Sequence, residues 1–404
     1  MIQAADTYDV AIAGAGPAGT SAAIHLALQG ARVLLCEQKR FPRAKLCGEF
    51  ISPECLPHFE RLGVAEQMLS AGGARLNKTV FYSRAGHNVT VPSHWFNNNS
   101  EALGLSRAEM DHKLIERAKS VGVSVLEDAH VSDLILEGER VRGIRIKTVS
   151  QTSARHAEII IDATGRAHAL VRRLKVQSRA PHAAQRSRFI AFKAHLENAQ
   201  VADGVCEIYF YPGGYGGLST VEDGLSNLCF IAAAKEVRRL GSDPETVIRE
   251  MVMKNARAAH TLDRAIARTE WLSVSLEKYG RRSLVPAEGL LTIGDAAAFI
   301  DPFTGSGMLM ALESGEVAAQ TIIGQMDKLG QPDSFAELAR EYRSQYSKLF
   351  DSRLRVSGFL RRAAFVPRLA EAAILCFGAS DKLRRKVARA TRPAPDHETG
   401  VQRY

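Results

Sequence analysis

Long apolar runs are missing from this 404-residue sequence, and none approaches the roughly 20 residues that a membrane-spanning helix needs. The first apolar run begins by Tyr8, which leaves no room for a signal peptide, so we expect a cytoplasmic protein. The six cysteines show no metal-type spacing, which predicts reduced thiols and no metal site.

An excess of acidic residues is missing as well, and the surplus positive charge is concentrated near the C-terminus. Residues 331–404 contain 15 Lys and Arg against 8 Asp and Glu, which accounts for +7 of the net charge of +9. The rest of the chain is close to neutral, so no general polyanion-binding surface and no nucleic-acid partner are expected. A hydrophobic content of 46% and a charged content of 24% are those of a soluble globular protein.

A glycine-rich turn near the N-terminus organises the first part of the chain. The apolar run from Tyr8 to Ala13 leads into Gly14-Ala15-Gly16-Pro17-Ala18-Gly19, and a helical pattern and a second apolar run follow. This is a βαβ unit with G-x-G-x-x-G, in which Gly14 makes the turn and Gly16 admits a pyrophosphate to the backbone. Gly19 lets the helix pack on the strand, and the helix N-terminus holds the phosphate.

An acid ends the second apolar run and favours one class of dinucleotide. Glu37 lies about 20 residues beyond the glycines, where a carboxylate accepts hydrogen bonds from a ribose diol. An acid at this point disfavours the 2′-phosphate of NADP, so FAD or NAD is expected. The next residue, Gln38, and the basic side chains of Arg43 and Lys45 follow in a loop that is expected to lie along the cofactor and its pyrophosphate.

A second cofactor-binding pattern lies far along the chain. The buried run Leu290–Ile293 ends in Gly294-Asp295, where a carboxylate can hold polyol hydroxyls. The turn that contains Gly305, Gly307 and Met308 then aims a helix N-terminus at the flavin, which gains negative charge on reduction.

Together these patterns predict an α/β fold with a doubly wound dinucleotide domain. The segments 1–77, 101–178 and 281–330 would form this discontinuous domain, and a β-rich substrate domain (78–100 and 179–280) would be inserted into it. A hairpin is predicted over 78–92, a helix after Ser52, and one helix from Pro244 to about Ala259. Residues 331–392 would form a helical C-terminal lid, and 393–404 a disordered tail.

These motifs, with Asp162-Ala163-Thr164-Gly165-Arg166 between them, resemble the three FAD signatures of the two-domain flavoprotein oxidoreductases. That group includes class A aromatic hydroxylases, flavin-dependent halogenases and geranylgeranyl reductases. The resemblance spans roughly residues 5–325 and implies bound FAD, with Asp162 and Gly165 at the cofactor. It also matches Arg107 to an arginine that touches flavin in the superfamily, although Arg107 could equally form a surface salt bridge.

The loop from Phe41 to Gly48 is similar to the F-P-R-x-K-x-C-G loop of geranylgeranyl and menaquinone reductases, whose cysteine sits close to the flavin. This implies a catalytic Cys47 that donates a proton or tunes the flavin. Glu49 departs from the reductases' glycine-rich continuation, and its position on the same loop makes it a candidate second acid or base. The alternative for Cys47 is a small buried filler. Lys78 invites comparison with the halogenase lysine, but an exposed lysine at a strand start is commoner.

Departures from the reductase pattern leave the substrate open. The reductases' Y-x-W-x-F-P segment corresponds here to Tyr215–Thr220, which keeps the tyrosine but lacks the second aromatic residue and the proline. Ala-Thr-Gly replaces the hydroxylases' Ala-Asp-Gly, so either NAD(P)H or a partner reductase could donate electrons. The candidate substrate-binding residues are Tyr209, Tyr211, Tyr215, Gly216, Pro302 and Phe303, with His94 and Trp95 in a loop beside the pocket.

The C-terminal region combines an apolar segment, Phe359–Phe377, with the basic segment Lys382–Arg389. This pairing suits a lid over an apolar substrate, peripheral membrane association or contact with a carrier protein. Helices packed on the FAD domain with a solvated basic face are the alternative.

The sequence therefore predicts an FAD-dependent oxidoreductase that acts on an apolar small molecule of lipid, isoprenoid or polyketide type. Reduction of a carbon–carbon double bond is the leading hypothesis. Oxygenation through a flavin hydroperoxide is the alternative, a halogenase comes third, and an electron-transfer flavoprotein is the non-enzymatic possibility.

Overall fold

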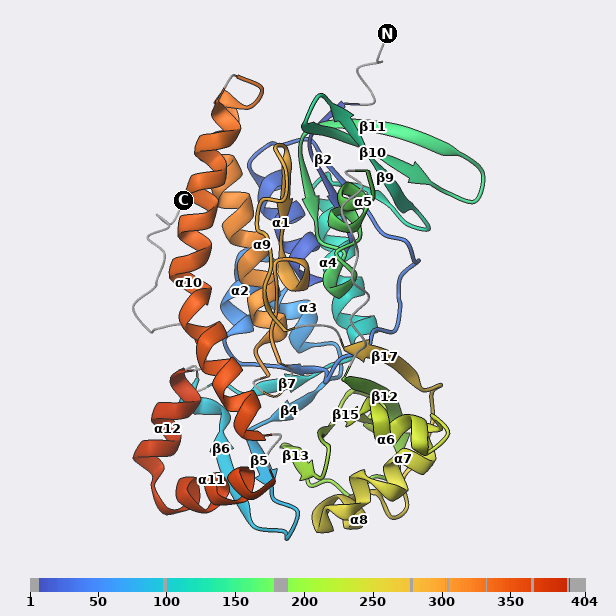
Figure 1. The fold of residues 1–404 in the computed structure, drawn as a ribbon, viewed down its shortest axis with the longest axis vertical. Helices are drawn as coiled ribbons and strands as arrows, with labels where there is room; N and C mark the ends of the chain where they lie inside the picture. The colour runs from blue at the N-terminus through green and yellow to red at the C-terminus, as the bar shows by residue number, and fades with distance from the viewer. Residues whose placement is uncertain are drawn as a thin grey trace.

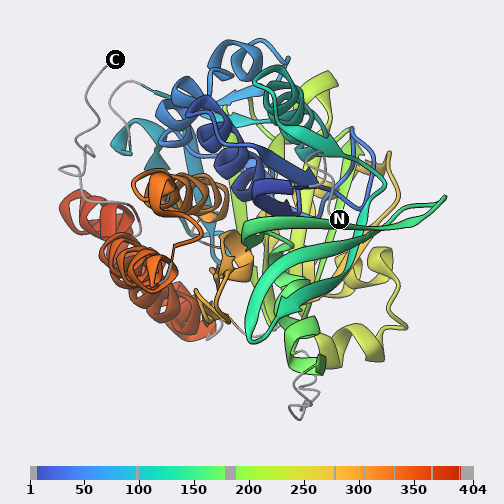
Figure 2. The same cartoon turned by 90° about the horizontal axis from the view of Figure 1, so that it is seen from above.

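The computed structural model describes residues 7–96, 100–177, 188–276, 279–301, 303, 305–331, 333–364, 367–390 and 392. Two sheets dominate, one in the upper and one in the lower half of Figure 1, and Figure 2 shows the same arrangement from above. The predicted α/β class is confirmed. The predicted tail (393–404) and the candidate Pro302 lie outside the described residues.

The first sheet has the strand order β8-β2-β1-β11-β10-β9, and β19 pairs with the end of β11. The strands β1, β2, β8 and β19 run parallel to their neighbours, whereas β9, β10 and the first half of β11 pair antiparallel. The bounds are β1 (Thr7–Ala13), β2 (Val33–Cys36), β8 (Ser124–Leu126), β9 (His130–Glu137), β10 (Arg140–Lys147), β11 (Thr152–Asp162) and β19 (Leu290–Thr292).

Alternate residues of β1 serve two different cores. Val10 and Ile12 pack with the helices on one face of the sheet, whereas Ala11 and Ala13 face the hairpin of β9 and β10. The helices that pack with Val10 and Ile12 are α1 (Pro17–Leu28), α2 (Cys55–Leu62), α3 (Ala65–Leu69), α4 (Arg107–Ser120) and α9 (Gly307–Ile323), whereas α5 (Ala169–Gln177) packs on the other face beside β9. Because a parallel strand is buried on both faces, the unbroken apolar run is the pattern expected for β1.

The second sheet has the order β16-β12-β15-β14-β13-β5-β6, with β17 beside β12. Its strands are β5 (Lys78–Tyr82), β6 (Asn88–Pro92), β12 (Phe189–Glu197), β13 (Val205–Tyr211), β14 (Gly214–Thr220), β15 (Ser226–Ala233), β16 (Ile266–Ala267) and β17 (Leu272–Leu276). The expected hairpin over 78–92 is confirmed, and β5 also pairs in parallel with β13. The sheet thus joins the two segments assigned to a substrate domain, although that division into domains stays a prediction.

Small elements complete the two halves. A three-stranded sheet contains β3 (Phe50–Ile51), β7 (Ala102–Gly104) and β4 (Ala74–Leu76), and a two-stranded one contains β18 (Gly280–Arg281) and β20 (Ala298–Phe299). The helices α6 (Ala234–Arg239), α7 (Pro244–Glu250) and α8 (Ala256–Leu262) cover one face of the second sheet.

Two local predictions need correction. The helix expected after Ser52 begins at Cys55, because the Ser52 carbonyl accepts from the Cys55 N–H in a preceding turn. The helix expected from Pro244 to Ala259 divides into α7 and α8, because the Asn255 side chain caps the second helix.

Three C-terminal helices follow, namely α10 (Ser334–Ala364), α11 (Pro367–Ala379) and α12 (Asp381–Ala390). Figure 1 shows α10 running along one side of the molecule, with α11 and α12 folded back beside the strands β5 and β6. No helix of the part that the structure describes is long and apolar enough to cross a membrane.

Candidate active site

The glycine-rich turn between β1 and α1 is packed too closely for a side chain at Gly14 or Gly19. A Cβ on Gly14, whose φ is +102°, would lie 2.4 Å from the Ala163 carbonyl oxygen, and one on Gly19 would lie 1.9 Å from the Gly14 oxygen. Gly16 stands at the N-cap of α1, and Gly16, Pro17 and Ala18 line a cavity of about 490 Å³. The turn therefore leaves free helix N–H groups facing that cavity, as an anion-binding turn requires.

Glu37 and Gln38 line the same cavity at the end of β2. The Glu37 carboxylate is buried, accepts from the Ala15 N–H at 3.2 Å and pairs with the Arg43 guanidinium at 3.1 Å. Glu37 is thus fixed against the glycine-rich turn, where a ribose diol would lie.

Two arginines at the cavity are held by one buried carboxylate that the sequence analysis missed. Asp111 accepts from Arg43 at 3.0 Å and from Arg107 at 2.7 and 2.9 Å. Burial opposes the charge on Arg107, but the Asp111 carboxylate outweighs this effect and raises the pKa of Arg107. The spacing of Arg107 and Asp111, four residues apart on α4, was the signal that could have revealed the pair.

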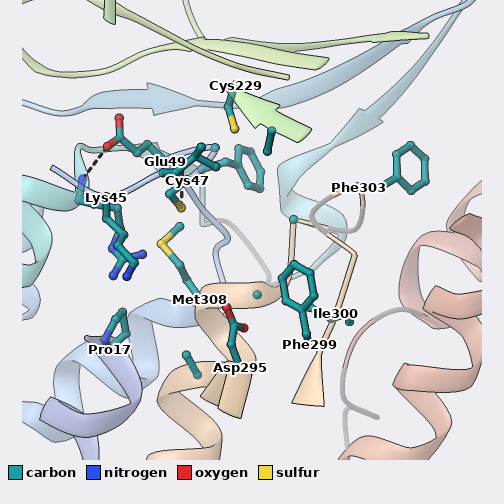
Figure 3. Close-up of a pocket in the computed structure, with 18 of the residues that line it drawn as sticks. Pro17, Lys45, Cys47, Glu49, Cys229, Asp295, Phe299, Ile300, Phe303 and Met308 are labelled. Carbon is teal, nitrogen blue, oxygen red and sulfur yellow. Dashed lines mark hydrogen bonds between the residues drawn. The ribbon is translucent and has the colours of Figure 1, made fainter. Parts of the chain in front are cut away.

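The loop from Arg43 to Glu49 crosses the cavity wall. Leu46 packs with the aromatic cluster of the second sheet, whereas the next residue, Cys47, packs against the core of the first. Figure 3 shows Cys47 and Met308 projecting into the cavity, which Cys229 of β15 also lines. Cys47 therefore lies at the junction of the two halves of the cavity.

Lys45 lines the cavity. Its side chain is exposed to the space of the cavity, while the surrounding protein buries it. This burial, together with the positive charges of Arg107 and Arg43, lowers the pKa of Lys45. The side chain is thus well placed to meet an anionic ligand, which would relieve the repulsion between the cations.

Glu49, the predicted second acid or base, lines the cavity and has several hydrogen-bond partners. Its side chain is fully buried and accepts from the Arg107 backbone N–H at 2.9 Å, from Lys193 at 3.0 Å and from His195 at 2.6 Å. Burial favours protonation, but the hydrogen bond from His195 and the charge of Lys193 outweigh it and lower the pKa of Glu49. An ionised and fully engaged carboxylate ties the Cys47 loop to β12 and is not available to donate a proton.

Asp162 also differs from its prediction, because it does not line the cavity. The strand ends there, and the fully buried carboxylate turns inward to accept from the N–H groups of Thr164, Leu170 and Val171 at the start of α5. The cavity is instead lined here by Gly165 and Arg166. Asp162 therefore holds the segment in place, and Arg166 is a candidate cofactor residue that was missed.

The second predicted pattern reaches the cavity as expected from the sequence. Gly294, Asp295, Gly305, Gly307 and Met308 all line it. Burial raises the pKa of Asp295, opposed by the nearby charges of Arg166, Arg107 and Lys45. The α9 helix begins at Gly307, so the N-termini of α1 and α9 both open on one cavity.

An aromatic cluster forms the other half of the cavity. The ring of Phe303 lies 5.7 Å from Phe81, 5.5 Å from Phe210 and 5.7 Å from Tyr215, measured between centroids. The Tyr215 hydroxyl donates to the buried Asp301 carboxylate. Such a wall suits an apolar ligand and leaves it few polar contacts.

Three residues predicted to bind substrate lie elsewhere. Strand alternation directs Ile208 and Phe210 into the cavity, so Tyr209 and Tyr211 point through the opposite face into the core beneath α7 and α8. Gly216 faces the same way, because a Cβ there would meet Phe230 at 2.9 Å. Lys78 and His94 are exposed, and neither belongs to the described residues that line the cavity.

The C-terminal helices close the remaining side of the cavity. Ala373, Ile374 and Phe377 of α11 and Arg384, Val387 and Ala388 of α12 line it. The Arg384 guanidinium lies 5.4 Å from the Trp95 ring centroid, and Arg392 lies 4.5 Å from Phe96 and pairs with Glu54 at 3.2 Å. These contacts hold α12 across the cavity, as a lid would lie.

The donor set fits FAD. Gly14 and Gly19 leave no room for a Cβ, a carboxylate stands where a ribose would lie, and a second carboxylate, Asp295, lies near the charges of Arg166, Arg107 and Lys45. The residues that would hold the dinucleotide in the cavity are Gly16, Glu37, Arg43, Asp295 and Met308.

The chain matches the family model described as FAD binding domain over residues 7–323, and it belongs to that family. It is an FAD-dependent oxidoreductase.

Among curated proteins it is similar to the digeranylgeranylglycerophospholipid reductase of Methanosarcina mazei, with 25% identity over 320 residues that cover 78% of this chain and 75% of that protein. The menaquinone reductase of Mycolicibacterium smegmatis is 26% identical over 335 residues, which cover 77% and 75%. The tryptophan 2-halogenase of Chondromyces crocatus is 26% identical over 340 residues, which cover 80% and 62%.

Solved structures share the fold. A geranylgeranyl bacteriochlorophyll reductase-like protein from Thermoplasma acidophilum superposes with a TM-score of 0.78 at 19% identity, covering 95% of this chain and 96% of that one. The myxobacterial chondrochloren halogenase superposes with a TM-score of 0.73 at 24% identity, covering 85% and 80%. Reductases and halogenases thus appear at similar distances, and the reaction is not fixed by likeness alone.

Proposed function

We propose that the protein reduces a carbon–carbon double bond in an apolar lipid-, isoprenoid- or polyketide-like molecule. The observation that carries this proposal is the position of Cys47 at the junction between the cofactor side and the aromatic side of one cavity. The similarity to reductases of an isoprenoid phospholipid and of menaquinone supports it.

Bound and reduced FAD supplies a hydride, and either NAD(P)H or a partner reductase restores the electrons. The chain's own contribution is to orient the substrate against Phe210, Tyr215 and Phe303 and to keep water from the reacting carbons. The Cys47 thiol gives a proton to the neighbouring carbon and regains one from water, so the substrate gains two hydrogens.

The loop is held in place for this task by side chains from the second sheet. Asn227 donates to the Cys47 carbonyl oxygen at 3.2 Å, and Lys193 and His195 hold Glu49 two residues further on. Fixed anchors at Cys47 itself and two residues beyond it limit the movement of the thiol relative to a bound substrate.

A halogenase receives no support from Lys78, whose side chain is exposed at the start of β5 and is absent from the described cavity lining.

Oxygenation is the alternative, and the reaction of the reduced flavin with oxygen distinguishes it from double-bond reduction. Anaerobically reduced protein, mixed with oxygen in the presence and absence of substrate, should return directly to the oxidised flavin spectrum. A transient absorption band that precedes the oxidised spectrum would contradict the reductase proposal.

The decisive variant is Cys47→Ala, and Cys229→Ala in β15, which also lines the cavity, is its control. Removal of a general acid should lower the rate of double-bond reduction by roughly 100-fold, with FAD content unchanged. We expect Cys229→Ala to keep most of the rate. Equal rates in the two variants would remove Cys47 from the mechanism.

A further inference from the structure

The helices α11 and α12 form a wall that is one helix thick. Their inner faces line the cavity with Ala373, Ile374 and Phe377 in α11 and with Arg384, Val387 and Ala388 in α12. Their outer faces are on the surface of the molecule, at the lower left of Figure 1. Whatever touches the outer faces is therefore separated from the cavity by these helices alone.

From Ala372 onward, in the part of α11 whose side chains the structure describes, the outer face is apolar. Its exposed side chains are Ala372, Leu375, Cys376 and Ala379, at the i, i+3, i+4, i+7 spacing of one helix face. Leu375 is 54% exposed, and no charged residue occurs between Glu371 and Asp381. A water-facing helix surface normally carries charges, so this face is suited to an apolar environment.

The outer face of α12 is basic at the same spacing. Lys382, Arg385, Lys386 and Arg389 are exposed and share one face, and Leu383 lies at its edge with 43% exposure. Among the described residues no carboxylate pairs with Lys382, Arg385 or Lys386, whereas Asp381 pairs with Arg384. Three uncompensated cations thus adjoin the apolar face of α11.

We propose that the outer face of α11 and α12 docks on an anionic lipid bilayer. An apolar helix face inserts among acyl chains, and adjacent cations pair with anionic headgroups. Docking in this way would set the lid over the cavity directly on the bilayer. An apolar substrate could then pass between the two helices without crossing water. The docking surface follows from exposure and charge and does not depend on which reaction the cavity carries out.

Vesicle co-sedimentation of the full-length, FAD-loaded protein tests the proposal without any substrate. The probes are vesicles of phosphatidylcholine alone and vesicles with roughly one-quarter phosphatidylglycerol. We expect binding to the anionic vesicles that weakens with added salt, because exposed charges are screened.

The triple variant K382E/R385E/K386E should bind the anionic vesicles on the order of a hundredfold more weakly, since each basic residue near the surface contributes about fivefold. Leu375→Gln should weaken binding by roughly tenfold or more, because a leucine is lost from the apolar contact. The milder K382Q/R385Q/K386Q variant removes the three charges without reversing them, so it should bind more tightly than K382E/R385E/K386E and more weakly than the parent protein. Bound FAD reports that each variant is folded.

The matched control reverses three exposed cations elsewhere, in K235E/R238E/R239E of α6, which Figure 1 shows on the other side of the molecule. This control should bind like the parent protein. Equal losses in the α6 and α12 variants would overturn the proposal, as would no binding to anionic vesicles. Binding to a purified acidic acyl carrier protein without binding to vesicles would overturn it in favour of a protein partner.

Discussion

At the residue scale, one buried carboxylate connects the cofactor loop to the substrate sheet. Glu49 adopts a left-handed backbone conformation with φ of +53° and binds Lys193 and His195 of β12. Lys193 is only 3% exposed, so its charge depends on this partner. The ion pair therefore stabilises the position of the Cys47 loop and would be costly to break.

We predict that Glu49→Gln lowers the free energy of unfolding by about 3 kcal/mol near neutral pH, because it leaves the Lys193 charge buried without a partner. The folded-state pKa of Glu49 is lowered, so the stability it contributes is present above the ordinary value of 4.5 and is lost as the pH falls through the folded value. Urea unfolding of both proteins across acid pH should show the difference shrinking. A constant difference would contradict this assignment.

A second prediction concerns the glycine-rich turn. Gly19→Ala places a Cβ 1.9 Å from a backbone oxygen and should reduce stability by about 3 kcal/mol or more, with loss of FAD binding. Gly358→Ala in α10 is the control, because nothing lies within 4 Å of its Cβ, and it should stabilise by about 0.5–1 kcal/mol. Thermal unfolding and flavin fluorescence measure both effects.

The positions of site residues could be predicted where a motif fixed the backbone conformation. They could not be predicted where the direction of a side chain depended on which face of a strand it occupied. Gly14, Glu37 and Asp295 reach the cavity because turn geometry sets their direction. Tyr209 and Tyr211 were placed on the wrong face, because one residue of register turns a side chain through the sheet. Asp162 was misassigned because a carboxylate after a strand can cap the next helix as readily as it can hold a ligand.

At the element scale, the α2 and α9 helices are joined by a second buried carboxylate. Glu316 of α9 accepts from Arg61 at 2.8 Å and interacts with His58 at 2.9 Å. Burial favours protonation of Glu316, but the hydrogen bonds from His58 and Arg61 outweigh it and lower the pKa to about 2. The ionised carboxylate therefore links the two helices.

We predict that Glu316→Gln reduces stability at neutral pH by about 3 kcal/mol, since the lowering of the Glu316 pKa from 4.5 to about 2 corresponds to roughly that free energy. The effect should be complete above pH 4.5 and should vanish as the pH falls to about 2. Glu116→Gln, which removes an exposed partner of Lys119, should change stability by less than about 0.5 kcal/mol. Comparable losses in the two variants would refute the argument.

The lid offers a further prediction at this scale. Arg392→Met removes the stacking on Phe96 and the ion pair with Glu54, so the lid should open about fivefold more often if roughly 1 kcal/mol of contact is lost. Iodide quenching of bound flavin should increase. Arg385→Met on the outer face of α12 should leave quenching unchanged. No change in either variant would show that α12 does not control access.

Helices and strands with a strong pattern were predicted well, and their breaks were not. The helical pattern expected after the glycine-rich turn is the α1 helix, which begins at Pro17. The division between α7 and α8 was missed because Asn255 is fixed by tertiary contacts, donating to carbonyls of Tyr82, Ser83 and Phe210. The sequence around Asn255 contains no pattern that predicts these distant partners.

At the scale of the whole molecule, the cofactor cavity draws on both sheets and on the C-terminal helices. FAD that binds there favours the folded state alone, so at about 100 times its Kd it should stabilise by about 2.7 kcal/mol. Thermal unfolding with and without added FAD measures this shift. A protein that takes up no FAD, or gains no stability from it, would contradict the assignment of the cavity.

The parallel pairing of β5 with β13 has a consequence for synthesis on the ribosome. About 110 residues separate the end of β6 from the start of β13, so the edge of β5 that pairs with β13 stays unpaired until these residues have been synthesised. At ribosomal speed the delay is roughly 5–20 seconds, during which an unpaired strand edge and the apolar face of the hairpin meet water. We therefore expect a chaperone to bind the nascent chain at this stage. Slower translation should increase the fraction of the protein that is lost to aggregation.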